Sequence, residues 1–208
     1  QEFGYDNNGN VHRMFNNFRN HLGTADYGDN TKGTIIFHQR SDDKERTAIF
    51  YRQSKFDLVD HGHYWYYEKD ATQEKKTEIE WLGVIYRAHY VRFAIWAILR
   101  EKTTGIEFFV TTTHLDYFSD PIPGHWVDYP MQWNQGQMMM NNSDLLAKYE
   151  GTGIRRSIIA TGDMNCNYTT DPIKNLINKG YADTYDLTTN HSFPDASCPR
   201  STFNTLST

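Results

Sequence analysis

The segment that most constrains the fold of this chain is the run RSIIATGDMN at residues 156–165. Its apolar and β-branched residues predict a short strand that stops at Gly162 and is followed at once by Asp163 and Asn165. Alternate residues of an extended segment point to the same side, so this carboxylate and this carboxamide can reach into one pocket. The pair suits phosphate chemistry, because a carboxylate can orient or deprotonate a water and a neutral amide can stabilise a developing phosphorane.

Two further polar patterns stand at positions of the same kind. The run EFFVTTTHLD at 107–116 predicts a strand of β-branched and aromatic residues that ends in His114 and Asp116. Glu2 follows Gln1 at the start of the sequence. The chain therefore presents three polar patterns in the order QE, THLD and TGDMN.

In this order the three patterns resemble those of the endonuclease/exonuclease/phosphatase superfamily, which includes deoxyribonuclease I, abasic-site endonucleases, sphingomyelinases and inositol polyphosphate phosphatases. The resemblance continues between and beyond them, in AIFYR at 48–52, KFDLV at 55–59, RFAIWA at 92–97, GYADTY at 180–185 and STF at 201–203. It covers nearly the whole chain. The fold that it implies is a four-layer α/β/β/α sandwich, in which two packed, mostly antiparallel sheets are flanked by helices.

The resemblance also implies a catalytic site that uses Mg²⁺ or Mn²⁺ to hydrolyse a phosphate ester. Glu2 would hold the metal, Asp163 would orient the attacking water, and Asn165 and His114 would stabilise the pentacoordinate phosphorus. Each position also has a structural interpretation. Glu2 could be a frayed terminal residue, Asp163 a turn residue, Asn165 a side-chain turn cap, and His114 a satisfied core histidine.

Two more residues are assigned to substrate binding. Asp116 would face the substrate or orient the loop behind it. Arg92 would contact phosphate, although an arginine in a strand more often pairs with a carboxylate. The pair His61 and His63 forms an H-x-H pattern that has no third ligand nearby in the sequence, which argues against a metal site there.

Other landmarks of the superfamily are missing from this chain. The superfamily has an asparagine on a strand before the Gln-Glu pair and a Ser-Asp-His segment near its end, and neither pattern occurs here. We therefore expect residues 1–208 to be a single domain that is truncated at both ends, with little activity of its own and with hydrolase activity in the full-length product.

Composition restricts the possible functions only mildly. The 208 residues suit one domain, and the net charge of -5 argues against a protein that coats nucleic acid nonspecifically, but it does not exclude a metal-dependent nuclease. Cys166 and Cys198 allow one disulfide or two thiols. The sequence shows no transmembrane segment or signal peptide and assigns no compartment.

The substrate is open. Nucleic acid, inositol phosphate, a phospholipid head group and a nucleotide would each fit one phosphate-binding core. We expect a monomer. The alternative function is a noncatalytic sandwich that binds a phosphorylated or lipid partner.

Periodicity, capping residues and composition locate most of the remaining elements. Together they predict helices at about 11–22, 131–149 and 171–179, and β-branched and aromatic residues predict strands at about 34–38, 46–52, 56–60, 92–100, 106–114 and 155–162. Loops are predicted at 68–79, which is rich in charge, and at 119–129, which is rich in proline. The Met138–Met140 run is interpreted as core filler, and Ile173, Leu176 and Ile177 as the buried stripe of the last helix.

Overall fold

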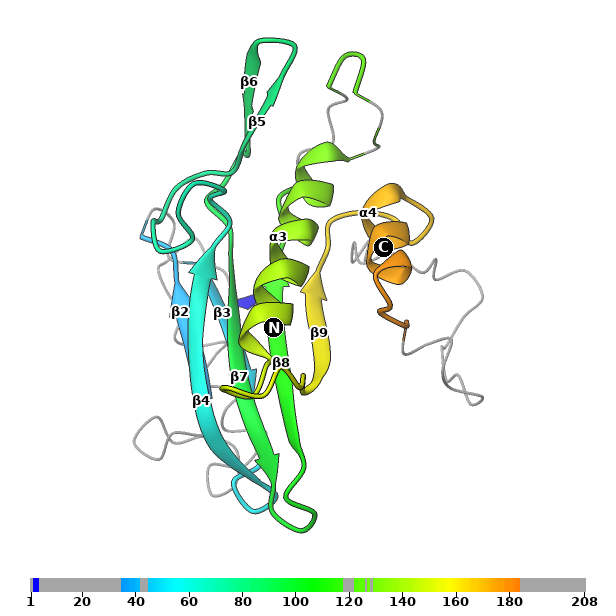
Figure 1. Cartoon of the computed structure of the whole chain (residues 1–208). Coiled ribbons are helices and arrows are strands. Elements are labelled where there is room, and N and C mark those ends of the chain that lie inside the picture. The colour runs from blue at the N-terminus through cyan, green and yellow to red at the C-terminus, as the bar shows by residue number, and fades with distance from the viewer. Residues whose placement is uncertain are drawn as a thin grey trace, which may run out of the picture.

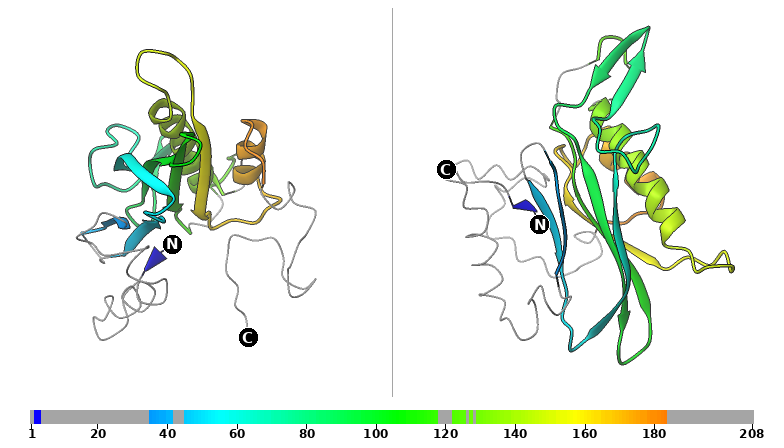
Figure 2. Two further views of the ribbon diagram at one scale, coloured as in Figure 1. Left: turned by 90° about the horizontal axis from the view of Figure 1, so that it is seen from below. Right: turned by 90° about the vertical axis from the view of Figure 1, so that its left-hand side faces the viewer.

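The chain folds into two facing β-sheets with helices on the outer side of the larger sheet (Figures 1 and 2). This computed structural model describes residues 2–3, 35–41, 45–117, 122–125, 127 and 129–183, and of residues 2, 3 and 35 it describes the backbone alone. The predicted helix at 11–22, the motif at 201–203 and Cys198 lie outside the described residues.

The smaller sheet is antiparallel and has the strand order β1-β3-β2. Its strands are β1 (Glu2–Phe3), β2 (Ile35–Gln39) and β3 (Arg46–Phe50). In β1 the backbone of Glu2 is in register with Thr47. This pairing places Glu2 opposite the beginning of β3.

The larger sheet has the order β4-β7-β8-β9 and contains β4 (Phe56–Trp65), β7 (Phe93–Glu101), β8 (Glu107–His114) and β9 (Ser157–Asp163). Its pairs are antiparallel except β8 and β9, which run in parallel. Apolar side chains from both sheets form the core between them: Ile36, Ile49, Tyr51, Trp65, Phe93, Ile95, Ala97 and Leu99. The predicted packing of two mostly antiparallel sheets is confirmed.

Two helices lie beside the larger sheet, α3 (Pro130–Leu146) and α4 (Asp171–Asn178) (Figure 2). Met139 and Met140 of α3 are buried, which confirms that the methionine run fills the core. In α4, Leu176 packs against the same core cluster as Met139, but Ile177 is 42% exposed, so its predicted burial was wrong. The apolar stripe of α4 at positions i, i+3 and i+4 is wider than the part of the core against which the helix packs.

A β-hairpin that the sequence did not predict projects beyond the sandwich (Figure 1). It consists of β5 (Glu78–Trp81) and β6 (Val84–Arg87). Leu82 and Gly83 connect the strands with positive φ angles of 51° and 79°, as a two-residue hairpin turn requires. The hairpin was not predicted because the charge-rich residues 68–79 were interpreted as a loop. Strand β4 also extends to Trp65, beyond its predicted end.

Among the described residues, no helix is long and apolar enough to cross a membrane.

Candidate active site

The parallel pairing of β8 and β9 brings two of the predicted site residues together. His114 and Asp163 are register partners at the carboxyl ends of these strands. The backbone N–H of Leu115 then donates to the Asp163 carbonyl oxygen at 2.9 Å, which keeps the two chain ends side by side. The sequence patterns at 107–116 and 156–165 thus lie side by side where β8 and β9 end.

Gly162 makes this close approach possible. Its φ angle is 136°, and a Cβ added to it would lie 2.0 Å from the carbonyl oxygen of Thr113 on β8. No L-residue with a side chain fits there without a backbone shift. The strand runs one residue past its predicted end, and the glycine fixes where Asp163 leaves β9.

Asn165 is tied to the backbone around it. It adopts a φ of 49°, its N–H donates to Asp163 Oδ1 at 2.8 Å, and its Nδ2 donates to the Leu115 carbonyl at 2.8 Å. Gln132 of α3 also donates from Nε2 to the Asn165 carbonyl at 3.3 Å. The side chain therefore acts as a clamp between the ends of β8 and β9, which agrees with the turn-cap interpretation, and its contact with phosphate stays a prediction.

Behind His114 lies a buried ionic network that the sequence reading missed. Glu45 is 8% exposed and precedes β3, and its carboxylate contacts Arg40, Arg92 and His114. The distances are 3.1 Å from Arg92 Nη1 to Glu45 Oε1 and 3.0 Å from His114 Nδ1 to the same oxygen. One carboxylate next to the smaller sheet thus contacts the histidine at the end of β8 and the arginine just before β7 in the larger sheet.

The contacts of His114 restrict its protonation state. Nδ1 lies 3.0 Å from Glu45 Oε1 and 2.8 Å from Arg92 Nη1. A carboxylate only accepts and a guanidinium only donates, so a neutral ring accepts from Arg92 with its proton on Nε2, and an imidazolium donates to Glu45. A neutral ring with its proton on Nδ1 would oppose the N–H of Arg92. Both favoured forms carry a proton on Nε2, the nitrogen directed away from the network.

Arg92 and Asp116 are both buried. Arg92 is 2% exposed and pairs with Glu45, so the carboxylate partner considered for it exists. Asp116 is 0% exposed, its N–H donates to Gln135 of α3 at 2.8 Å, and its Oδ2 accepts from the N–H of Tyr90 at 2.9 Å. These contacts favour roles in which both residues position other groups, and their direct contact with substrate stays a prediction.

The donor groups at this edge suit a hard divalent cation. Mg²⁺ prefers a few carboxylate oxygens and retains several waters, so it does not need a cage of protein ligands. The described residues contain no cluster of three or more His, Cys, Asp or Glu side chains that could hold a metal. Glu2, whose backbone pairs with Thr47, stays the predicted ligand, and Glu45 is engaged by two arginines and unsuited to the role.

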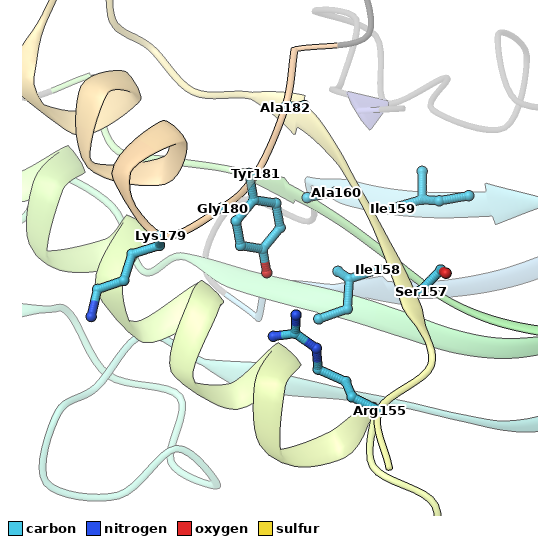
Figure 3. A pocket seen from close by; sticks show the side chains of 9 residues that line it. All are labelled: Arg155, Ser157, Ile158, Ile159, Ala160, Lys179, Gly180, Tyr181 and Ala182. Atoms are coloured by element: carbon cyan, nitrogen blue, oxygen red, sulfur yellow. The ribbon is translucent and has the colours of Figure 1, made fainter. Parts of the chain in front are cut away.

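The remaining candidate groups lie elsewhere. His61 and His63 lie on β4, and the ring of His63 stacks on His38 of β2 with centroids 3.6 Å apart, which is a packing contact between the sheet edges. Burial raises the pKa of the Cys166 thiol to about 11, so this cysteine is not activated. A pocket runs along the outer edge of β9, between Arg155 and Tyr181 (Figure 3).

Local sequence reasoning could not find Glu45, since its partner His114 is 69 positions away. The one available signal was the charge-rich run RSDDKER at 40–46, which comes directly before the buried residues of β3. Charged residues next to a core strand are rarely buried unless they are paired.

Comparison with solved structures shows which known proteins share this fold. An endonuclease/exonuclease/phosphatase family protein and a mannosyl-6-phosphatase, both from Bacteroides thetaiotaomicron, each superpose with a TM-score of 0.63 at 24% identity over 84% of this chain. ANGEL2, a 2',3'-cyclic phosphatase, superposes with a TM-score of 0.57 at 18% identity over 81% of this chain. The resemblance seen in the sequence is confirmed at the level of the fold.

This chain spans about half of those proteins, covering 54% and 55% of the two Bacteroides chains and 41% of ANGEL2. No protein-family model and no curated protein sequence matches the chain.

Proposed function

We propose that the full-length protein containing this chain is a divalent-metal-dependent phosphoesterase. The observation that carries this proposal is the buried Glu45 network, which holds His114 beside Asp163 at the ends of two parallel strands. A fixed donor next to a carboxylate is what hydrolysis of a phosphate ester needs. The fold is also that of a mannosyl-6-phosphatase and of a 2',3'-cyclic phosphatase.

Each residue has a defined task in the proposed reaction. His114 donates from Nε2 to a nonbridging phosphate oxygen, with Glu45 fixing the ring and stabilising its positive charge. Asp163 orients the attacking water and accepts its proton. Asn165 keeps Asp163 in place through its N–H, and its amide is the second predicted donor to the phosphate.

A divalent cation held by Glu2 would neutralise charge on the phosphate and help to position it. Mg²⁺ and Mn²⁺ are the proposed ions. The candidate substrates stay nucleic acid, inositol phosphate, phospholipid and nucleotide, and the proposed unit is a monomer.

Substitution of Asp163 tests this function against the noncatalytic alternative. In the full-length protein, Asp163→Asn should lower kcat by roughly 10²-fold or more with little change in KM, because the carboxylate acts in the chemical step. The assay is hydrolysis of a panel of phosphate monoesters and diesters with and without Mg²⁺. Asp144→Asn, a change on the exposed side of α3, is the matched control.

Two results would contradict the proposal. Unchanged turnover by Asp163→Asn would contradict the proposed mechanism, in which Asp163 acts on the attacking water. Metal-independent binding of phosphorylated ligands without any hydrolysis would favour the noncatalytic sandwich.

A further inference from the structure

A second acid–histidine pair lies next to the Glu45–His114 pair. His89 Nδ1 is 3.3 Å from Oδ1 of the buried Asp116. The two pairs are connected by one guanidinium, since Arg92 Nη1 contacts His114 and Arg92 Nε lies 3.9 Å from Asp116 Oδ2. His89 therefore belongs to the same local arrangement as the candidate catalytic histidine.

The environment of His89 fixes the ring and leaves it accessible. Its ring stacks on that of Tyr117, with centroids 4.8 Å apart and an interplanar angle of 1°. The His89 side chain is 40% exposed, whereas the Asp116 side chain is 0% exposed. With Nδ1 donating to the carboxylate, the other ring nitrogen, Nε2, is directed away from Asp116.

The order of the strands puts the segment that leads into β7, which carries His89, and the strand β9, which carries Asp163, on opposite sides of β8. Adjacent strands run β7-β8-β9, with His89 and Arg92 just before β7, His114 ending β8 and Asp163 ending β9. A phosphate bound at His114 would then lie between Asp163 and the segment that carries His89. Displacement at phosphorus needs the attacking and leaving oxygens roughly in line, on opposite sides of the phosphorus.

We propose that His89, oriented by Asp116, is the general acid that protonates the leaving group of the phosphate ester. The inference rests on the proposed phosphoesterase function. The water oxygen forms the new P–O bond while its proton passes to Asp163. The bond from phosphorus to the leaving oxygen breaks with its electron pair on that oxygen, which takes the proton from His89 Nε2. Proton exchange with solvent then resets both groups.

Other groups near His89 do not replace it. Tyr117 stacks on the ring, and partial desolvation, a hydrogen bond with Tyr90 and the charge of Asp116 raise the pKa of its phenol. The guanidinium of Arg92 pairs with Glu45 and also lies over the Tyr90 ring, 5.3 Å from its centroid. The imidazolium form of His89 can donate a proton from Nε2 while Nδ1 stays bonded to Asp116.

Leaving-group dependence separates a general acid from a structural histidine. An alkoxide needs a proton as it departs, whereas 4-nitrophenolate does not. In the full-length protein, His89→Gln should lower kcat for propyl phosphate roughly 10²-fold and kcat for 4-nitrophenyl phosphate less than about threefold. The corresponding diesters serve if the enzyme prefers diesters. His61→Gln, on the exposed part of β4, is the matched control, and Tyr117→Phe tests the neighbouring phenol.

Equal losses on both esters would overturn the proposal, and so would a selective loss on the alkyl ester in Tyr117→Phe but not in His89→Gln. Loss of all hydrolysis in Asp163→Asn together with a wild-type profile in His89→Gln would reject the role of His89 and retain the phosphoesterase function.

A second measurement does not depend on turnover. In imidazole nitrogen NMR, inorganic phosphate should shift the His89 and His114 resonances and leave His61 unchanged, because one phosphate oxygen occupies the leaving-group position. If only His114 responds, His89 does not face the bound phosphate and the proposal is wrong, whatever the activity of the protein.

Discussion

The two halves of the candidate site are built by different means. On the β3, β7 and β8 side, buried charges fix the side chains: Glu45 holds Arg40, Arg92 and His114. On the β9 side, the backbone fixes the carboxylate, through Gly162. The ionic half is thus sensitive to the loss of a charge, and the backbone half to the addition of a single carbon atom.

The largest effect should come from breaking the ionic half. Glu45→Gln removes the negative charge that contacts two buried guanidinium groups, and we expect a loss of about 3–5 kcal/mol in the free energy of unfolding. Denaturant unfolding of the full-length protein measures it. Glu80→Gln, an exposed change in β5, should stay within about 0.5 kcal/mol. A Glu45→Gln protein as stable as the wild type would mean that charge does not hold this half together.

The addition of one methyl group at Gly162 should destabilise the backbone arrangement on the β9 side of the site. Gly162→Ala should cost roughly 1–3 kcal/mol or more, because the new Cβ would overlap the Thr113 carbonyl and force β8 and β9 apart. Gly153→Ala is the matched control, since Gly153 also has a positive φ, 70°, but a Cβ there meets nothing within 4 Å. The difference between the two variants measures the clash together with the extra backbone strain of a side chain at the φ of 136°. Equal costs would refute the close approach.

The pH dependence of stability sharpens the comparison by identifying a contribution that belongs to neither half. Burial, and then the charge of His63, lowers the pKa of His38 from 6.5 to about 4, and burial also lowers the pKa of His63. Both rings are therefore protonated more readily in the unfolded chain. Their contribution is present above pH 6.5 and is lost as the pH falls toward about 4.

This effect should be the smallest of the three. One proton gives a slope of about 1.4 kcal/mol per pH unit, and the partial exposure of the two rings reduces it further. Thermal unfolding between pH 4 and pH 7 measures the slope. His38→Gln should flatten it and His61→Gln should not. If His38→Gln leaves the slope unchanged, acid sensitivity arises in the carboxylates of the two halves.

The sequence predicted the parts of the site whose cause is local. His114, Asp163 and Asn165 lie at or just past the ends of strands rich in β-branched, aromatic and apolar residues, so their placement at strand ends could be predicted directly. Glu45 and His89 could not be found in this way, because their partners come from other strands and nothing near them in the sequence marks them as buried or oriented. The β5–β6 hairpin was missed because the charged stretch before it resembled a loop.

The parallel pairing of β8 and β9 has a consequence for the order of folding. Antiparallel neighbours such as β7 and β8 are joined by a short turn, but β8 and β9 are separated by the whole of α3 and the segments around it. Closing so long a loop costs chain entropy before any contact compensates for it, so this pair should form late. His114 and Asp163 would then first meet near the end of folding, after most of the core is in place.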